Sequence, residues 1–372
     1  MHTGTVTLLR SLPGGFRVYW IELAGEEDAF ATTEAATAAT ATELIAPGIA
    51  RAGSVSDRFD RLAYARGAHE AVGRTDADLD AAAALLRAAP MNRSGTAAVR
   101  ARNVRNTTSV STAAAERTLG SVLVDRGFDV DLDDPDHVLR ALFAAGTRAD
   151  HDAVAGADGA DGSCCALGWV AVEPSRAFAP KPTDRPFFQP GSMAPADARA
   201  CVNLAGAAPG RTLLDPMCGT GGLPIETGLV GADVLAVDAQ SKMVRGTRRN
   251  LHAYVGEDAD AGPSGTTVDW HVARGDATAL PLSDDAVDGV AFDAPYGRQS
   301  KIARHELADL VGGALAEAAR VAPRAVMVAD RDWRGPARDA GWTVDAVFER
   351  RVHRSLTRYV TVLERPDAKA SR

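Results

Sequence analysis

The stretch that decides the fold reads LLDPMCGTGG and runs from Leu213 to Gly222. It joins a short apolar, strand-like run to an acidic residue, Asp215, and a turn with three glycines. Glycines let the backbone turn tightly against a ligand, and the helix that follows offers free N–H groups at its start. A dinucleotide site prefers G-x-G-x-x-G beside a pyrophosphate, so GTGG after an acidic residue favours a nucleoside ligand. An ordinary turn between a strand and a helix explains the same residues if nothing else supports a ligand.

The sequence after this stretch alternates between strand-like and helix-like segments. We expect strands at 233–239, 270–277, 288–293 and 325–330, and helices at 222–229, 240–254 and 303–321. This alternation predicts a parallel, doubly wound α/β sheet. Residues 343–364 are expected to add an antiparallel hairpin at its end.

Two further aspartates follow successive strands, where a nucleoside ligand would need them. Asp238 comes about 20 residues after the glycines, the position from which an acid grips ribose hydroxyls. Asp276 ends the next strand, where it can accept a hydrogen bond from an adenine amino group. Either residue alone is equally well explained as a helix cap. Together with Asp215, Gly219 and Gly221, they predict a site for a methyl donor, S-adenosylmethionine.

The fourth strand ends in Asp293-Ala294-Pro295-Tyr296, which resembles the (Asp/Asn/Ser)-Pro-Pro-(Tyr/Phe) motif of amino-methyltransferases. An exocyclic amine is a poor nucleophile because its lone pair is delocalised into the ring. Hydrogen bonds from the amine to Asp293 and to the carbonyl near Ala294 would localise that pair, and Tyr296 would stack on the base. We therefore predict that Asp293, Pro295 and Tyr296 are catalytic, although a capped turn at a strand end is the alternative.

The segment before the first strand of the sheet is rich in proline. Residues 174–195 contain six prolines and read as a linker, within which Phe188 either packs over the donor or joins the core. Before the linker, we expect strands at 17–24, 96–105 and 166–172, and helices at 57–72 and from Ser111 to Gly127. The predicted domains are an α+β region at 1–172, a linker at 173–195 and the doubly wound domain at 196–372. The sequence leaves open whether residues 1–16 belong to the folded protein.

The charge of the chain is unevenly distributed. The formal net charge is −8, but residues 87–126 hold seven arginines against two acidic residues, a local balance of +5. Arg100 and Arg102 lie on one face of the strand predicted there, which suits contact with phosphates. A solvated surface is the alternative for these two residues and for Arg93, Arg105 and Arg354, which we also predict to contact RNA.

Some classes of protein are disfavoured by composition. The four cysteines include no C-x-x-C pair, so neither a disulfide framework nor a metal site is expected, and a cytoplasmic location follows. No run of 18 apolar residues predicts a membrane span, and the first residues do not resemble a signal peptide. We also expect a monomer.

The motifs together resemble those of the archaeal tRNA guanosine-10 N2-methyltransferases. The resemblance rests on DPMCGTGGLPIETGLVGADVLAVDAQ, on DAPYGR and HRSLTR downstream, and, more loosely, on VRARNVRN and VDLDDPDHVLRALF upstream. It implies a ferredoxin-like domain, a THUMP domain that binds RNA, a linker, and a class I methyltransferase domain with a mostly parallel seven-stranded sheet. It also implies S-adenosylmethionine as cofactor, tRNA as partner, and two transfers that give mono- and then dimethylguanosine. Ala294 departs from the family's usual proline, although its backbone carbonyl is retained.

Other functions are compatible with part of this evidence. The same chemistry on another tRNA guanosine or on ribosomal RNA is the nearest alternative. Methylation of adenine N6 in DNA is disfavoured because the N-terminal half resembles an RNA-binding module. A non-catalytic RNA-binding factor with a degenerate domain is disfavoured by the intact Asp293 and Tyr296.

Overall fold

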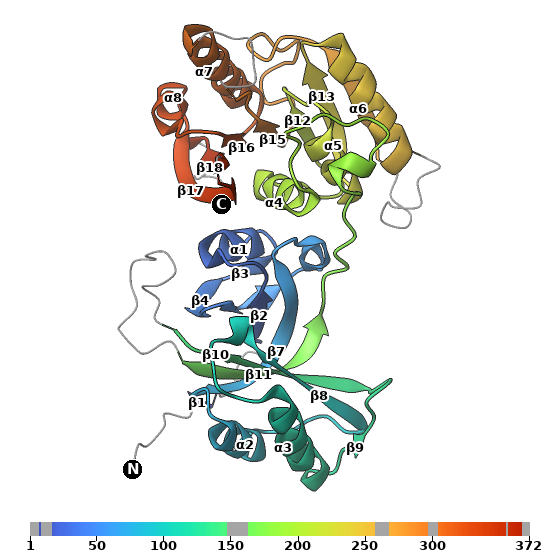
Figure 1. Cartoon of the computed structure of the whole chain (residues 1–372), viewed down its shortest axis with the longest axis vertical. Coiled ribbons are helices and arrows are strands. Elements are labelled where there is room, and N and C mark those ends of the chain that lie inside the picture. The colour runs from blue at the N-terminus through green and yellow to red at the C-terminus, as the bar shows by residue number, and fades with distance from the viewer. Residues whose placement is uncertain are drawn as a thin grey trace. The chain divides into compact units, whose positions relative to one another are not determined.

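The chain divides into two compact units, and the division falls between Arg176 and Ala177 (Figure 1). The structure is a computed structural model, and it describes residues 7–8, 17–146, 163–256, 268–296, 304–354 and 356–366. The boundary between the units falls inside the proline-rich segment that the sequence predicts as a linker.

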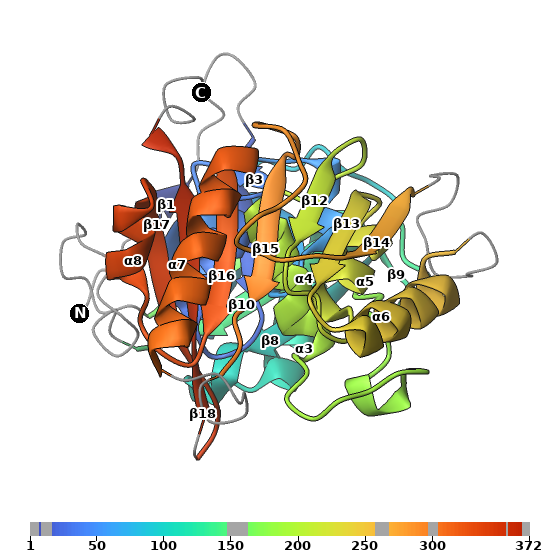
Figure 2. The ribbon, with the colours of Figure 1, turned by 90° about the horizontal axis from the view of Figure 1, so that it is seen from above.

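The second unit is built on a sheet that has seven strands in the described part of the chain. In order across the sheet they are β14, β13, β12, β15, β16, β18 and β17, as Figure 2 shows. Their bounds are Thr212–Asp215 for β12, Asp233–Asp238 for β13, Trp270–Arg274 for β14, Gly289–Asp293 for β15, Arg324–Ala329 for β16, Thr343–His353 for β17 and Leu356–Glu364 for β18. The first five are parallel to one another, and β18 is antiparallel to both β16 and β17. The predicted parallel sheet and terminal hairpin are confirmed.

Helices cover both faces of this sheet. They are α4 (Pro195–Ala205), α5 (Gly222–Leu229), α6 (Ser241–Tyr254), α7 (Arg304–Val321) and α8 (Arg334–Asp339). On one face, Ile225 of α5 and Leu251 of α6 pack against Ala236. On the opposite face, Leu315 of α7 packs against Phe292 of β15. The two cores are separate because successive side chains of a strand point to opposite faces.

Most of the proline-rich segment packs on the second unit. The backbone N–H of Ala179 donates to Glu226 Oε1 over 2.9 Å, and Arg199 forms a 2.7 Å ion pair with Glu226 Oε2. Both charged side chains are at most 3% exposed, so this buried pair joins the segment, α4 and α5. The segment also contains a short 3-10 turn, η4 (Pro182–Asp184).

The first unit contains a mixed sheet, nine-stranded in its described residues. Eight strands follow the order β4, β5, β2, β7, β11, β10, β8 and β9, and β1 pairs with β7. Their bounds are Thr7–Leu8 for β1, Tyr19–Leu23 for β2, Glu43–Ala46 for β4, Ile49–Ala52 for β5, Ala65–Thr75 for β7, Thr96–Asn103 for β8, Asp129–Val130 for β9, His137–Ala144 for β10 and Cys164–Val172 for β11. A separate pair joins β3 (Ala39–Thr40) to β6 (Ser54–Val55), and the helices are α1 (Asp28–Ala35), α2 (Leu79–Ala88) and α3 (Thr112–Asp125). Leu85 of α2 and Leu119 of α3 pack on one face of this sheet, against Leu139 of β10.

The helix predicted at 57–72 is wrong. Residues 57–61 form a 3-10 turn, and β7 follows it as a strand. β7 pairs with β2 on one side and with β11 on the other, so both its edges are used. Consecutive buried side chains on both faces remove the polar–apolar alternation that marks a half-exposed strand. The helix that begins after Ser111 is confirmed, with Ser111 accepting from Ala114 N.

No helix among the described residues is long and apolar enough to cross a membrane.

Replacing Arg199 by Ala should destabilise the second unit strongly. The change leaves the carboxylate of Glu226 buried without its cation, a loss that typically costs about 3–5 kcal/mol. Urea unfolding followed by tryptophan fluorescence measures it, with Arg245→Ala on the exposed surface of α6 as the control. Equal unfolding midpoints for the two variants would show that the pair contributes little.

Candidate active site

The glycine turn after β12 has a backbone that requires glycine at a defined position. Gly221 caps α5 in the left-handed region, with φ of +81°, and a Cβ there would lie 2.9 Å from Thr247 Cγ2. Both the backbone angle and the contact exclude other residues. At the start of the turn, Met217 N donates to Asp215 Oδ1 over 3.0 Å. Burial raises the pKa of Asp215 well above its usual value.

The carboxylate of Asp238 connects this turn to the next strand. It ends β13 and accepts from Gly219 N over 3.0 Å and from Gln240 N over 2.8 Å, using one oxygen for each. Each carboxylate oxygen has two lone pairs, so both keep capacity for a further donor. Burial raises the pKa of Asp238, and these two backbone hydrogen bonds act in the opposite direction.

Asp276 lies after β14 in a different environment. Its Oδ1 accepts from Thr278 N over 2.9 Å and from Thr278 Oγ1 over 2.8 Å. These hydrogen bonds lower the pKa of Asp276, so it is ionised at neutral pH. The arrangement is a capped turn in which both hydrogen bonds go to Oδ1.

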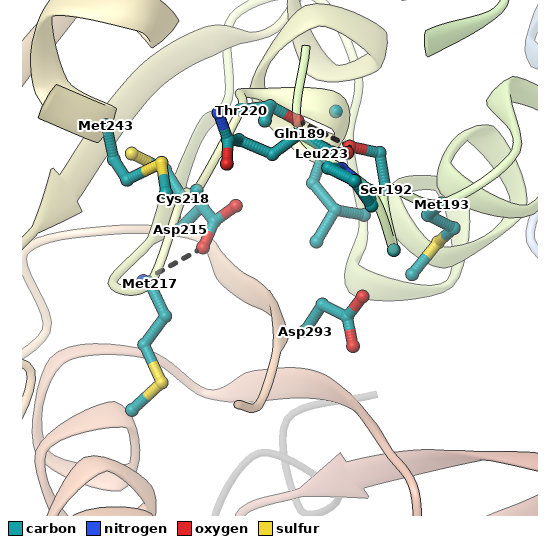
Figure 3. Close-up of a pocket in the computed structure, with 14 residues that line it drawn as sticks. Gln189, Ser192, Met193, Asp215, Met217, Cys218, Thr220, Leu223, Met243 and Asp293 are labelled. Carbon is teal, nitrogen blue, oxygen red and sulfur yellow. Dashed lines mark hydrogen bonds between the residues drawn. The ribbon is translucent and has the colours of Figure 1, made fainter. Parts of the chain in front are cut away.

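Two adjoining cavities open above the carboxyl ends of the strands. The first, which we call the glycine-loop chamber, has a volume of about 200 Å³, and Figure 3 shows Asp215, Ser192, Leu223 and Asp293 around it. The second, which we call the Asp238 chamber, has a volume of about 300 Å³. Its walls include Asp238, Gln240, Asp276, Ala277, Pro295 and Leu310, while Met217, Gly219, Met243 and Asp293 line both chambers. Most of the residues predicted to bind the methyl donor therefore line one or both of these two adjoining cavities.

Two of the residues predicted to bind the methyl donor lie outside both chamber linings. Gly221 lines neither chamber and acts through the conformation of the turn. Phe188 is 38% exposed and also lies outside both linings, whereas its neighbours Gln189 and Ser192 line the glycine-loop chamber. Contact of Phe188 with a donor stays a prediction.

Asn250 holds the proline-rich segment beside the glycine turn, and sequence reasoning missed it. Its fully buried side chain accepts from Phe187 N over 2.9 Å and donates to Phe187 O and to Thr220 O, over 2.9 and 2.8 Å. Gly246, one turn earlier, leaves the space that the Phe187 ring fills. A signal existed, since asparagine and glycine are unusual at buried positions of a helix.

The predicted catalytic loop begins at the end of β15. Asp293 Oδ1 accepts from Tyr296 Oη over 2.8 Å, and Tyr296 Oη accepts in turn from Arg358 Nε over 2.8 Å. Burial raises the pKa of Asp293 to about 6, while Arg358 and Tyr296 act in the opposite direction. Arg358, on β18, is the last residue of the HRSLTR motif, for which sequence reasoning leaves open contact with RNA phosphate, support of the catalytic loop or a solvated face.

The five arginines predicted to contact RNA have different surroundings. Arg93 donates to Glu70 over 2.8 Å and lies 5.5 Å from the centre of the Trp169 ring. Arg105 forms an ion pair with the buried Asp28 and also donates to a backbone carbonyl, so it joins parts of the first unit.

Arg100 and Arg102 project from the face of β8 that α2 and α3 do not cover. Arg140 is the register partner of Arg100 on β10 and shares that face. Arg102 is 43% exposed and lies 3.0 Å from Glu22 on β2, and Arg100 donates to the carbonyl of Leu132. Arg354 is exposed in the turn between β17 and β18.

The fold and the site together define a class I methyltransferase. Its features are a parallel sheet with one antiparallel strand inserted next to its edge, and a glycine turn and carboxylates at the ends of the central strands. Residues 182–359 match the family described as an RMKL-like methyltransferase domain.

The sequence comparison with known proteins is more specific. A tRNA (guanine(10)-N2)-dimethyltransferase of Methanothermobacter thermautotrophicus is 34% identical over 314 residues, which cover 82% of this chain and 84% of that protein. Another from Pyrococcus abyssi is 29% identical over 260 residues, or 67% and 68% of the two chains. This chain belongs to the family of tRNA (guanine(10)-N2)-dimethyltransferases. Among solved structures, TrmN from Thermus thermophilus aligns with a TM-score of 0.46 and 22% identity, over 94% of this chain and 99% of that one.

Replacing Asn250 by Leu should release the proline-rich segment from α6. The variant leaves the buried N–H and carbonyl of Phe187 without partners, which typically costs about 1–3 kcal/mol for each group. Hydrogen exchange read by mass spectrometry should show faster exchange in a peptide that covers 186–193. A peptide from β16 should keep its wild-type rate. Unchanged exchange in both peptides would show that Asn250 does not hold the proline-rich segment.

Proposed function

We propose that this protein transfers methyl groups from S-adenosylmethionine to the exocyclic N2 of guanosine 10 in tRNA. Successive transfers would give N2-methyl- and then N2,N2-dimethylguanosine. Membership of the family supports the substrate. The observation that carries the reaction is the position of Asp293, which lines both chambers next to the glycine turn. We further propose that the protein acts as a monomer in the cytoplasm, where its four buried cysteines stay free thiols.

The residues around the two chambers fit the donor. Asp238 has lone pairs left for ribose hydroxyls after it has accepted from the backbone, and Asp276 has a free oxygen for an adenine amino group. The Asp238 chamber also has apolar walls at Ala277, Pro295 and Leu310, which suit the faces of a purine ring. Bound there, S-adenosylmethionine supplies a methyl group attached to a positively charged sulfur.

Asp293 would prepare the amine for attack. The carbonyl of Ala294 and the second carboxylate oxygen of Asp293 are the acceptors nearest to the end of β15, and hydrogen bonds to them localise the nitrogen lone pair. The nitrogen must lose a proton when it gains a methyl group. A carboxylate whose pKa is raised to about 6 accepts that proton more readily than an ordinary aspartate.

The first unit would supply affinity for tRNA through the face of its sheet that α2 and α3 do not cover. Arg100, Arg102 and Arg140 share that face, and arginines in such an array can bind successive phosphates. Because Arg105 is paired with Asp28, we assign it a structural role in this proposal. Arg93 and Arg354 stay candidates for contact with RNA.

Replacing Asp293 by Asn should remove most turnover and leave donor binding intact. Loss of a preorganised acceptor of this kind lowers the rate on the order of 100-fold or more. In the wild type, kcat should fall about tenfold for each pH unit below about 6, because protonated Asp293 can no longer accept, and should level off above that pH. Methylation of unmodified tRNA, read by nucleoside mass spectrometry, measures both effects and identifies the modified base.

Asp238→Ala is the matched control for this prediction. It removes a carboxylate from the same space but should mainly weaken binding of S-adenosylhomocysteine, by roughly 1.5–3 kcal/mol in calorimetry. If Asp293→Asn retained its turnover, or the product were not an N2-methylguanosine, the assignment would be wrong.

Replacing both Arg100 and Arg102 by Ala should weaken tRNA binding and flatten its salt dependence. Each lost phosphate contact reduces the slope of log K against log salt by about one. Filter binding at several salt concentrations measures the slope. The control is the pair Arg87→Ala and Arg117→Ala, which removes equal charge from α2 and α3 on the opposite face. Equal slopes for the two double variants would mean that charge alone, and not this face, attracts the RNA.

A further inference from the structure

Arg358 is a buried cation at the meeting point of three segments. It lies on β18, and its residue is 4% exposed. Its Nε donates to Tyr296 Oη over 2.8 Å, and its Nη2 donates to the carbonyl of Gly191 over 2.9 Å. The same Nη2 lies 3.9 Å from Asp293 Oδ2. One side chain therefore donates to the catalytic loop and to the segment that lines the glycine-loop chamber, and it also places a positive charge near Asp293.

This burial excludes a direct role in holding RNA. A guanidinium with almost no exposed surface cannot reach a phosphate on a bound polyanion. Burying it is also costly unless its donors are satisfied by protein acceptors. The two hydrogen bonds that it donates, to Tyr296 and Gly191, are to groups that border the proposed active site, so its role lies there.

The direction of the hydrogen bonds follows from the chemistry of the groups. A guanidinium can only donate, so the oxygen of Tyr296 must accept from Arg358. The tyrosine proton is then directed to Asp293 Oδ1, 2.8 Å away. Asp293 Oδ2, at 3.9 Å from Arg358, is beyond hydrogen-bond distance but is still attracted by the positive charge. One carboxylate oxygen is thus engaged, and the other keeps its lone pairs.

We propose that Arg358 is a positioning residue for methyl transfer, which acts through Tyr296 to engage one oxygen of Asp293 and leave the other for the substrate amine. This proposal rests on the proposed function of Asp293. The bond to Gly191 adds a second effect, because it fixes the wall formed by 189–192 relative to the catalytic loop.

Arg358 is the cation that acts on Asp293, and the other charged groups that act on it are acidic. Asp330, which follows β16, raises the pKa of Asp293, and Asp215, at the end of β12, is a second acidic group that interacts with it. On the far side of Arg358, Asp197 of α4 forms an ion pair with Arg350 over 3.0 Å. Removing the positive charge of Arg358 leaves Asp293 among acidic neighbours and should raise the pKa of Asp293 further.

The first test is the ionisation of Asp293 itself, which needs neither donor nor RNA. Carboxyl ¹³C NMR titration, assigned by difference from Asp293→Asn, should give a midpoint near pH 6 in the wild type. Arg358→Gln should move the midpoint to higher pH, and Arg358→Lys should bring it part of the way back. Arg324→Gln is the matched control, because Arg324 also pairs with a residue of β18, Glu364, but does not touch the catalytic loop. Its midpoint should stay at the wild-type value.

The second test is kinetic. Arg358→Gln should lower kcat on the order of 10- to 100-fold and leave the affinity for tRNA within about twofold of wild type. The acidic limb of its pH profile should move with the NMR midpoint. Tyr296→Phe should show a similar loss of kcat, and the double variant should be no slower than Arg358→Gln alone, because the two residues act in series.

Several outcomes would overturn the proposal. They are an unmoved midpoint in Arg358→Gln, losses of rate that multiply in the double variant, or a shift of equal size in Arg324→Gln. If Arg358→Gln does not fold, Arg358→Lys and Tyr296→Phe give the same comparisons. A shifted midpoint in a protein that methylates no RNA would support the link between Arg358 and Asp293 and would contradict the proposed function instead.

Discussion

The parallel pairing of β12 with β13 on one side and with β15 on the other is the constraint on which the site depends. Because α5 and α7 leave these strands toward opposite faces, the chain separates at the carboxyl end of β12 and a crevice forms there. Leu214 is level with Val290, so β15 continues beyond the end of β12 and carries Asp293 past Asp215. The register of the strands therefore determines how far each carboxylate extends toward the two cavities.

The carboxylates of the site differ in a way that suits different tasks. Burial is the largest cause of the raised pKa of Asp215, Asp238 and Asp293, whereas hydrogen bonds from Thr278 lower the pKa of Asp276. A carboxylate shielded from water accepts hydrogen bonds more strongly, but burying its negative charge destabilises the folded state. Backbone N–H groups offset that cost at Asp238, and only at Asp293 is a buried cation the compensating group. Asp293, whose pKa is raised to about 6, can therefore change its protonation state near neutral pH.

The parts of the fold that could be predicted from sequence are those fixed by local chemistry. Every strand and helix expected after residue 210 coincides with an observed element, because the glycines and strand-end aspartates mark each boundary. β7 was not predictable in this way, since pairing on both edges erased its alternation. Sequence reasoning left the role of Arg358 open between contact with RNA phosphate and support of the catalytic loop, because its contact with Tyr296 spans 62 residues and depends on the antiparallel insertion of β18. The family resemblance includes the HRSLTR motif, which contains Arg358, but does not specify this contact.

The arginines of the first unit show why a count of charges overstates attraction for RNA. Arg105 compensates the buried Asp28, Arg93 pairs with Glu70, and Arg102 lies beside the buried Glu22. An arginine that neutralises a buried acid adds no net field at long range, although its exposed donors can still meet a phosphate. Acidic residues outside 87–126 therefore neutralise part of the net charge of +5 in that segment. What the sheet retains is an ordered array on the face of β8 and β10, and recognition of tRNA by such an array depends on the spacing of phosphates more than on total charge.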